Sequence, residues 1–192
     1  MASVAFPDHS KSIDVSDGTH YGYVNVLPQP GKPTLLLLHG YPSSSYGWHH
    51  QVQQAISAGY GVIAPDLLGY GDTSKPTDVA AYDHTIMARH IAEILDEEKV
   101  PTVIAIGHDW GAAFLSTFAR LFSKRISLLI FVAVGYGPSQ AIMADMHAVD
   151  AQMTQFIGRP LFGYWQFHNR PDAASILEDT DVGRVTYLLS LG

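Results

Sequence analysis

The chain has 192 residues, of which 47% are hydrophobic and only 15% are charged, so a packed core is expected and a disordered tail is excluded. Its 11 Lys and Arg residues against 18 Asp and Glu residues give a formal net charge of −7, which argues against a nucleic-acid partner. There is no Cys, which excludes disulfides, a thiol nucleophile and thiolate zinc sites.

Neither a membrane span nor a secretory signal is evident. The longest uninterrupted apolar run, Leu128–Val134, is far shorter than the roughly twenty residues that a bilayer-spanning helix needs. The N-terminal stretch Met1–Val15 carries Asp8, Lys11 and Asp14 and has no apolar centre. We therefore expect a cytoplasmic protein.

Residues 12–134 read as alternating strands and helices. Two antiparallel strands are predicted within Ser12–Leu27, joined at the Asp17-Gly18 turn pair. The continuous apolar run Thr34–Leu38 is typical of a strand buried on both faces of a parallel sheet. The elements predicted after it are a helix capped within Ser43–Ser45 and running to about Ser57, strand Gly61–Pro65, helix Tyr82–Glu98, strand Thr102–Ile106, helix Gly111–Ser123 and strand Ile126–Val134. This alternation predicts an α/β fold, with a mostly parallel sheet and helices on both faces.

The alternation stops at Gly135, and no further strand is evident. The rest of the chain contains Met143, Met146 and Met153 and an aromatic cluster, Phe162–His168, which indicate a mostly helical segment over the sheet. We therefore expect a core at residues 1–135 and a helical lid at residues 136–192.

The segment Gly107–Gly111, Gly-His-Asp-Trp-Gly, follows a predicted strand and opens an amphipathic helix, which is the context of a nucleophile elbow. The two glycines would let the strand and helix pack closely around a strained central residue. That residue is Asp109, whose carboxylate is ionised at neutral pH and can attack carbon directly, giving an alkyl-enzyme ester. Such chemistry suits epoxides and alkyl halides. The alternative is an ordinary turn in which Asp109 caps the helix.

A second motif, His39-Gly40-Tyr41-Pro42, directly follows the strand Thr34–Leu38. In this architecture an oxyanion hole is built from the amide after the nucleophile and one amide of this loop, here Trp110 and Tyr41. The alternative is a plain strand-end turn with a buried His39. A third, glycine-containing loop, Asp66–Ser74, is interpreted as scaffold.

In this order and spacing, the three motifs resemble those of the epoxide hydrolase group of the α/β-hydrolase superfamily, although each alone is shared with haloalkane dehalogenases and other members. The motifs are His39–Pro42, Asp66–Ser74 and Gly107–Gly111. The resemblance runs from about Ser12 to the last residue. It implies an α/β-hydrolase fold whose helical lid is inserted after the sixth strand.

The resemblance also implies the reaction, which is the opening of a small apolar epoxide to a vicinal diol through an ester on Asp109. Lid Tyr hydroxyls would activate the epoxide oxygen, and the stretch before Pro171 places the first of them at Tyr164. The residues expected to line the substrate pocket are His39, Pro42 and Trp165. No metal or organic cofactor is expected, because the sequence has neither a phosphate-cradling glycine fingerprint nor a ligand cluster.

A haloalkane dehalogenase is one alternative, since Trp110 could supply a halide donor. The usual second donor of those enzymes is an Asn at the position of Tyr41, so Tyr41 and Tyr164 favour the epoxide.

A second alternative is a non-catalytic ligand-binding protein of the same fold. In the family a His beyond the lid activates water, whereas only His147 and His168 follow the elbow here, and both lie in the lid segment. Six strands and a lid use the whole chain, which leaves no residues for the C-terminal strands, the orienting acid, the His or a second lid Tyr. We therefore expect the N-terminal portion of an enzyme, either as a fragment of a longer chain or as a truncated gene product or splice form. Its unpaired sheet edge is expected to promote self-association.

Overall fold

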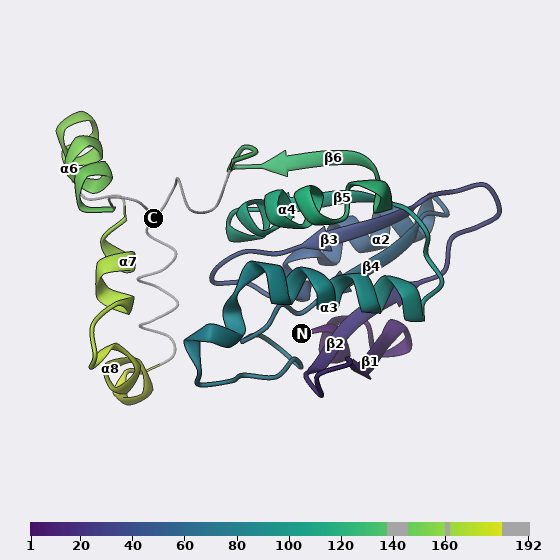
Figure 1. Ribbon diagram of the computed structural model, residues 1–192, viewed down its shortest axis with the longest axis horizontal. Helices are drawn as coiled ribbons and strands as arrows, with labels where there is room; N and C mark the ends of the chain where they lie inside the picture. The colour runs from purple at the N-terminus through teal and green to yellow at the C-terminus, as the bar shows by residue number, and fades with distance from the viewer. Residues whose placement is uncertain (138–145, 160–161, 182–192) are drawn as a thin grey trace. The chain divides into compact units, whose positions relative to one another are not determined.

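The computed structural model describes residues 1–137, 146–159 and 162–181 (Figure 1). The chain forms two compact units, Met1–Ser139 and Gln140–Gly192. The first unit contains the sheet, and the second is helical in its described residues.

A single six-stranded sheet organises the first unit. Its strands are β1 (Ser10–Asp14), β2 (His20–Val26), β3 (Thr34–Leu38), β4 (Gly61–Pro65), β5 (Val103–His108) and β6 (Ile126–Val132). They lie in the order β1-β2-β4-β3-β5-β6. Neighbours from β4 to β6 are parallel, whereas β2 is antiparallel to both β1 and β4. The predicted, mostly parallel sheet is confirmed.

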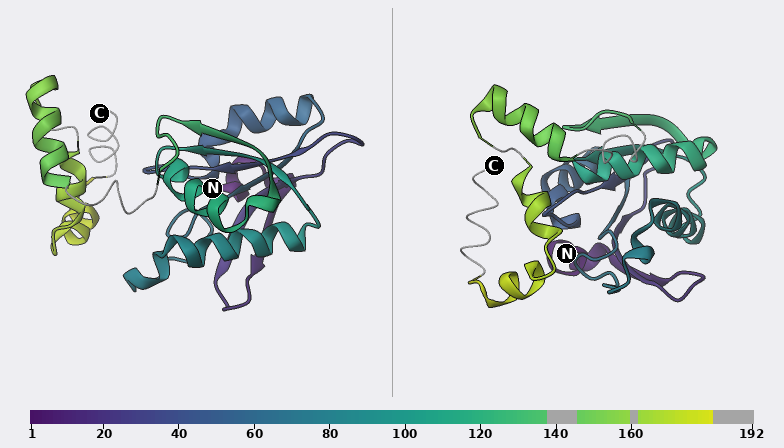
Figure 2. Two further views of the ribbon diagram at one scale, coloured as in Figure 1. Left: turned by 45° about the horizontal axis from the view of Figure 1, so that its top comes forward. Right: turned by 60° about the vertical axis from the view of Figure 1, so that its left-hand side comes forward.

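Helices cover both faces of this sheet (Figures 1 and 2). The helices of the first unit are α1 (Ala2–Ala5), α2 (His49–Ser57), α3 (His84–Glu97) and α4 (Trp110–Leu121), and its 3₁₀ turns are Pro7–His9, Ser45–Trp48, Val79–Tyr82 and Ser123–Arg125. On one face, Leu36 and Leu38 of β3 belong to a core shared with α3 and α4. On the other face, Leu37 belongs to a core shared with α1 and α2. Both faces of β3 are therefore buried, as its apolar run predicts.

Several predicted boundaries shift, and three of these shifts have an identifiable cause. The helix predicted from Tyr82 begins at His84, because the Asp83 carboxylate accepts hydrogen bonds from the backbone N–H groups of Thr85 (2.7 Å) and Ile86 (3.3 Å). Strand β5 runs two residues past the predicted end at Ile106, since its pairing with β6 continues to His108. Strand β6 ends at Val132 rather than Val134, where Ala133 adopts a φ of +68°.

The second unit has three described helices, α6 (Met146–Ile157), α7 (Gly163–His168) and α8 (Ala173–Asp179). The described residues after 135 contain no strand, in agreement with the helical expectation. Met143 lies outside the described residues. None of the helices described is long and apolar enough to cross a membrane.

Candidate active site

Asp109 occupies a strained turn between β5 and α4. Its φ of +54° and ψ of −124° place a residue with a side chain in a region that favours glycine, at a cost of about 1–3 kcal/mol. The flanking glycines permit the turn: a Cβ on Gly107 would lie 2.6 Å from the carbonyl oxygen of Gly111, and one on Gly111 would lie 2.7 Å from the carbonyl carbon of Leu38. This backbone has the form of a nucleophile elbow.

The loop after β3 reaches the Asp109 carboxylate directly. The backbone N–H of Tyr41 donates a 3.0 Å hydrogen bond to Oδ1 of Asp109. This approach requires glycine at position 40, because a Cβ on Gly40 would lie 2.7 Å from the Cβ of Asp109. The Tyr41–Pro42 peptide bond is cis, and Pro42 is exposed. The Tyr41 amide is thus aimed at a carboxyl oxygen that would carry negative charge before attack and during ester hydrolysis.

Trp110 is the first residue of α4 and is half-buried. The first-turn N–H groups of a helix have no intrahelical acceptor and carry the positive end of the helix dipole. That placement suits the predicted donor role of the Trp110 amide toward Asp109, which stays a prediction.

His39 links the loop His39–Pro42 to the neighbouring glycine-containing loop, Asp66–Ser74. Its ring is 2% exposed, Nδ1 donates to the carbonyl of Gly40 at 2.9 Å, and Nε2 accepts from the backbone N–H of Leu67 at 2.9 Å. Burial lowers the pKa of His39, which favours the neutral ring that this arrangement requires. The described hydrogen bonds of His39 are to the backbone, so its predicted place in the substrate pocket stays a prediction.

Asp66 supports the same loops from inside the protein. Its side chain is fully buried and accepts hydrogen bonds from the backbone N–H groups of Ser45 (2.8 Å) and Asp72 (3.0 Å). Burial by itself raises the pKa of Asp66, but these hydrogen bonds outweigh it and the net shift is downward. These contacts agree with the scaffold role assigned to the loop.

In the second unit, Tyr164 and Trp165 lie half-buried on α7. Their rings meet edge to face, with centroids 5.8 Å apart, and Trp165 in turn stacks on Phe162 at 4.4 Å. The predicted roles of Tyr164 as an acid and of Trp165 in the pocket stay predictions.

Of the two His residues that follow the elbow, His147 lies in the first turn of α6 and His168 ends α7. The His168 ring lies edge-on to Tyr164, with centroids 6.3 Å apart, and burial lowers its pKa. Among the described residues of the first unit, no imidazole is hydrogen-bonded to Asp109.

Two residues of interest were not predicted from the sequence. His84 begins α3, its ring lies edge-on to Phe114 of α4 with centroids 5.4 Å apart, and its Nδ1 is buried without a hydrogen-bond partner among the residues described. Because α3 precedes β5 and α4 follows it, both helices begin at the end of the sheet where Asp109 lies. The second is Asp150, a buried carboxylate of α6. Neither His84 nor Asp150 belongs to a local sequence motif, so the sequence alone does not identify either residue.

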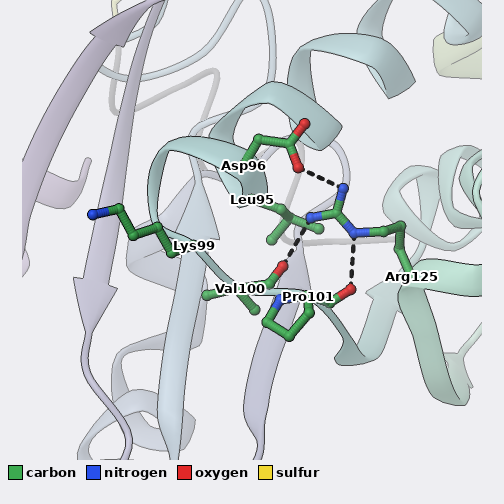
Figure 3. A pocket seen from close by; sticks show the side chains of 6 residues that line it. All are labelled: Leu95, Asp96, Lys99, Val100, Pro101 and Arg125. Carbon is green, nitrogen blue, oxygen red and sulfur yellow. Dashed lines mark hydrogen bonds and ion pairs between the residues drawn. The ribbon is translucent and has the colours of Figure 1, made fainter.

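A surface pocket of about 400 Å³ lies before β5, at the strand end opposite Asp109 (Figure 3). Its lining residues are Leu95, Asp96, Lys99, Val100, Pro101 and Arg125. The guanidinium of Arg125 donates to Asp96 (2.6 Å) and to the carbonyls of Val100 (2.8 Å) and Pro101 (2.9 Å). Arg125, which directly precedes β6, therefore links that strand to the end of α3 and the residues after it. The described residues contain no group of three or more His, Cys, Asp or Glu side chains that could hold a metal ion.

Comparison with known proteins gives consistent matches. The sequence model of the alpha/beta hydrolase fold matches residues 33–169. The chain is 35% identical over 106 residues to epoxide hydrolase A of Mycobacterium tuberculosis, which covers 55% of this chain and 33% of the relative. It is 40% identical over 106 residues to epoxide hydrolase 3 of Siraitia grosvenorii, covering 55% and 34% respectively. These alignments span about a third of the length of these curated relatives.

Solved structures give the same likeness. The crystal structure of epoxide hydrolase A from Mycobacterium thermoresistibile superposes with a TM-score of 0.61 at 32% identity, over 70% of this chain and 44% of that one. An epoxide hydrolase from Vigna radiata gives a TM-score of 0.65 at 28% identity, over 74% and 45% respectively.

Proposed function

Because the chain belongs to the alpha/beta hydrolase fold family, we propose that it opens epoxides to vicinal diols through an ester on Asp109. The observation that carries the proposal is an aspartate, rather than a serine, at the strained elbow, with the Tyr41 amide on its Oδ1. The named relatives, all epoxide hydrolases, support the substrate class.

The hydrogen bond from Tyr41 makes the two carboxyl oxygens of Asp109 unequal. Oδ1 is held by the amide, which leaves Oδ2 to attack an epoxide carbon. The carbon–oxygen bond of the ring breaks, the ring oxygen takes a proton from the Tyr164 hydroxyl, and an ester forms on Asp109. Water, deprotonated by a base, then attacks the carboxyl carbon. The Tyr41 and Trp110 amides stabilise the resulting oxyanion. Collapse of this intermediate breaks the ester carbon–oxygen bond, and the departing alkoxide takes the proton of the new carboxyl group, which gives the diol and the Asp109 carboxylate. The proton held by the base returns through water to the Tyr164 oxygen.

The two parts of the chain would divide this work. In the proposal, residues 1–135 form the catalytic core and residues 136–192 contribute a lid with Tyr164. The substrate is a small apolar epoxide that contacts His39, Pro42 and Trp165. Attack needs only Asp109 and an acid, whereas ester hydrolysis also needs a base, and neither His147 nor His168 follows a strand as the base of the family does. Hydrolysis of the ester should therefore lag behind attack.

Intact-protein mass spectrometry tests the proposal. After incubation with a reactive aryl epoxide, the chain should gain one substrate mass, and Asp109→Ala should gain none. Asp8→Ala, which removes an exposed carboxylate, is the matched control and should react like the wild type. If neither adduct nor diol depends on Asp109 while circular dichroism reports folded protein, the activity is wrong and a non-catalytic binding protein is favoured.

The dehalogenase alternative is tested in the same experiment. The half-buried Trp110 indole beside the nucleophile is the observation that favours it. A bromoalkane of similar size should release little bromide compared with the amount of epoxide consumed. Bromide release faster than epoxide consumption, and dependent on Asp109, would favour the dehalogenase.

A further inference from the structure

Asp150 is a buried carboxylate on α6 whose two oxygens both contact the neighbouring helix α7. The residue is 5% exposed. Its Oδ1 accepts a 2.9 Å hydrogen bond from the backbone N–H of Phe162, and its Oδ2 accepts one of 3.1 Å from Nε2 of Gln166. An Asp is seldom buried to this degree unless such bonds compensate for its lost hydration. The carboxylate is thus built into the contact between the two helices.

These two contacts bracket Tyr164 in sequence. Phe162 is the N-cap residue of α7 and provides no side-chain cap of its own. Asp150, from a different helix, accepts a hydrogen bond from the N-cap backbone N–H itself, at the end where a helix favours negative charge. Helix α7 has only six residues, far fewer than the roughly 12–15 that an isolated helix needs for even marginal stability. Its first turn therefore depends on outside contacts of this kind.

The direction of the Tyr164 ring depends on the same turn. Tyr164 lies edge-on to Trp165, and Trp165 stacks on Phe162, whose amide Asp150 holds. If the first turn of α7 frays, the Phe162 ring is no longer held in place, and the rings of Trp165 and Tyr164 that pack in sequence against it become mobile. The Tyr164 hydroxyl would then sample many directions instead of one.

We propose that Asp150 is a positioning residue for Tyr164: by binding the Phe162 amide and the Gln166 side chain, it fixes the turn of α7 that presents the Tyr164 hydroxyl to the epoxide oxygen. The inference rests on the proposed function, in which Tyr164 donates the proton. A positioned proton donor typically contributes about 10²–10⁴-fold to a rate. Asp150 acts only through that donor.

The test measures the rate of ester formation on Asp109 in four variants of the full chain. Asp150→Leu removes both acceptors while keeping a similar size, and should slow the reaction by about tenfold or more. Asp150→Asn keeps an acceptor for the Phe162 amide and can donate to a flipped Gln166 amide, so it should retain most of the rate. Tyr164→Phe should slow the reaction at least as much as Asp150→Leu. The double variant Asp150→Leu/Tyr164→Phe should be no slower than Tyr164→Phe alone, because both changes remove the same group's contribution.

Hydrogen exchange supplies an independent readout. The Phe162 amide should exchange faster in Asp150→Leu than in the wild type or in Asp150→Asn. Asp179→Leu, which changes an exposed carboxylate on α8, should alter neither the exchange nor the rate.

The outcomes distinguish the positioning role of Asp150 from the proposed function on which it rests. If Tyr164→Phe slows the reaction but Asp150→Leu does not, or if their effects multiply in the double variant, the positioning role is wrong and the proposed function stands. If Tyr164→Phe leaves the rate unchanged, or if the wild type forms no ester, both the proton-donor assignment and the role of Asp150 are overturned.

Discussion

The backbone N–H of Tyr41 and Oδ1 of Asp109, 68 positions apart in sequence, are joined by a 3.0 Å hydrogen bond. The contact spans two adjacent parallel strands, since Tyr41 follows β3 and Asp109 follows β5. It fixes one carboxyl oxygen, and in the proposed mechanism it so defines which oxygen is left for attack.

Gly40→Ala should disrupt the hydrogen bond between the Tyr41 N–H and Asp109. The added Cβ would lie 2.7 Å from the Cβ of Asp109 and 2.8 Å from the carbonyl oxygen of His108, so the loop has to move away. A displacement of about 1 Å can cost on the order of 10²-fold in rate, and a loss of that size is expected in ester formation. Gly135→Ala is the matched control, because its Cβ would meet nothing within 4 Å. Equal rates in Gly40→Ala and the wild type would show that the loop does not orient the carboxylate.

Asp109→Gly should be inactive and yet more stable than Asp109→Ala. Both variants lose the carboxylate and its hydrogen bond to Tyr41, but only glycine adopts a φ of +54° without strain. The expected difference in the free energy of unfolding is about 1 kcal/mol or more in favour of glycine. Urea titrations of the two variants measure it. A more stable alanine variant would mean that the turn relaxes when the carboxylate is removed.

The strands that the sequence predicted best are those whose signal is local. Thr34–Leu38 and Gly61–Pro65 match β3 and β4 residue for residue, because each is a short apolar run bounded by Pro or Gly. The end of β5 at His108 was not predicted, since it depends on pairing with β6. The helix predicted from the Ser43–Ser45 cap begins as a 3₁₀ turn, Ser45–Trp48, whose first free amide, on Tyr46, is bound by the Ser44 hydroxyl.

In the candidate site, too, the residues with a local sequence signal were predicted and those placed by tertiary contacts were not. Asp109 and Tyr41 were predicted because each lies in a motif next to a strong strand. Asp150 was not, because its partners are 12 and 16 residues away and on another helix. His84 likewise gains its buried environment only when α3 packs beside Phe114 of α4. Such tertiary contacts leave no periodic or motif signal in one sequence.

Acidification below about pH 6.5 should destabilise the protein partly through His39. Burial lowers the pKa of His39 below its ordinary value of 6.5, so the unfolded chain takes up a proton at a pH where the folded chain does not. Stability is therefore highest above pH 6.5 and falls as the pH drops toward the folded pKa. Burial shifts the pKa of His84 in the same direction and adds to the loss.

Urea titrations at pH 7.5 and 5.5 check this pH dependence. His39→Gln should be less stable than the wild type at pH 7.5, because it loses packing and a ring hydrogen bond, and the gap should narrow at pH 5.5. The exposed His50 serves as a control, since His50→Gln should leave the loss between the two pH values unchanged. A gap that stays constant or widens on acidification would contradict the assignment to His39.

Self-association through β6 is the remaining prediction. Among the residues described, β6 pairs only with β5, so its other edge presents backbone N–H and C=O groups to any strand of suitable shape. Leu128, Ile130 and Val132 alternate along one face of β6 and are 52%, 38% and 42% exposed. A second copy offers the same edge and the same apolar face, so two β6 strands could pair about a twofold axis. We expect the chain to show concentration-dependent association at micromolar concentrations.

Ile130→Lys should reduce that association, because a charge on an edge strand opposes the approach of a like strand. Leu27→Lys is the matched control: Leu27 is 75% exposed but lies just past the end of β2, away from the β6 edge. Analytical ultracentrifugation over a tenfold range of concentration distinguishes the variants. The wild type and Leu27→Lys should shift to larger species as concentration rises, whereas Ile130→Lys should remain monomeric. A monomeric wild type, or equal association of all three proteins, would show that the β6 edge does not drive assembly.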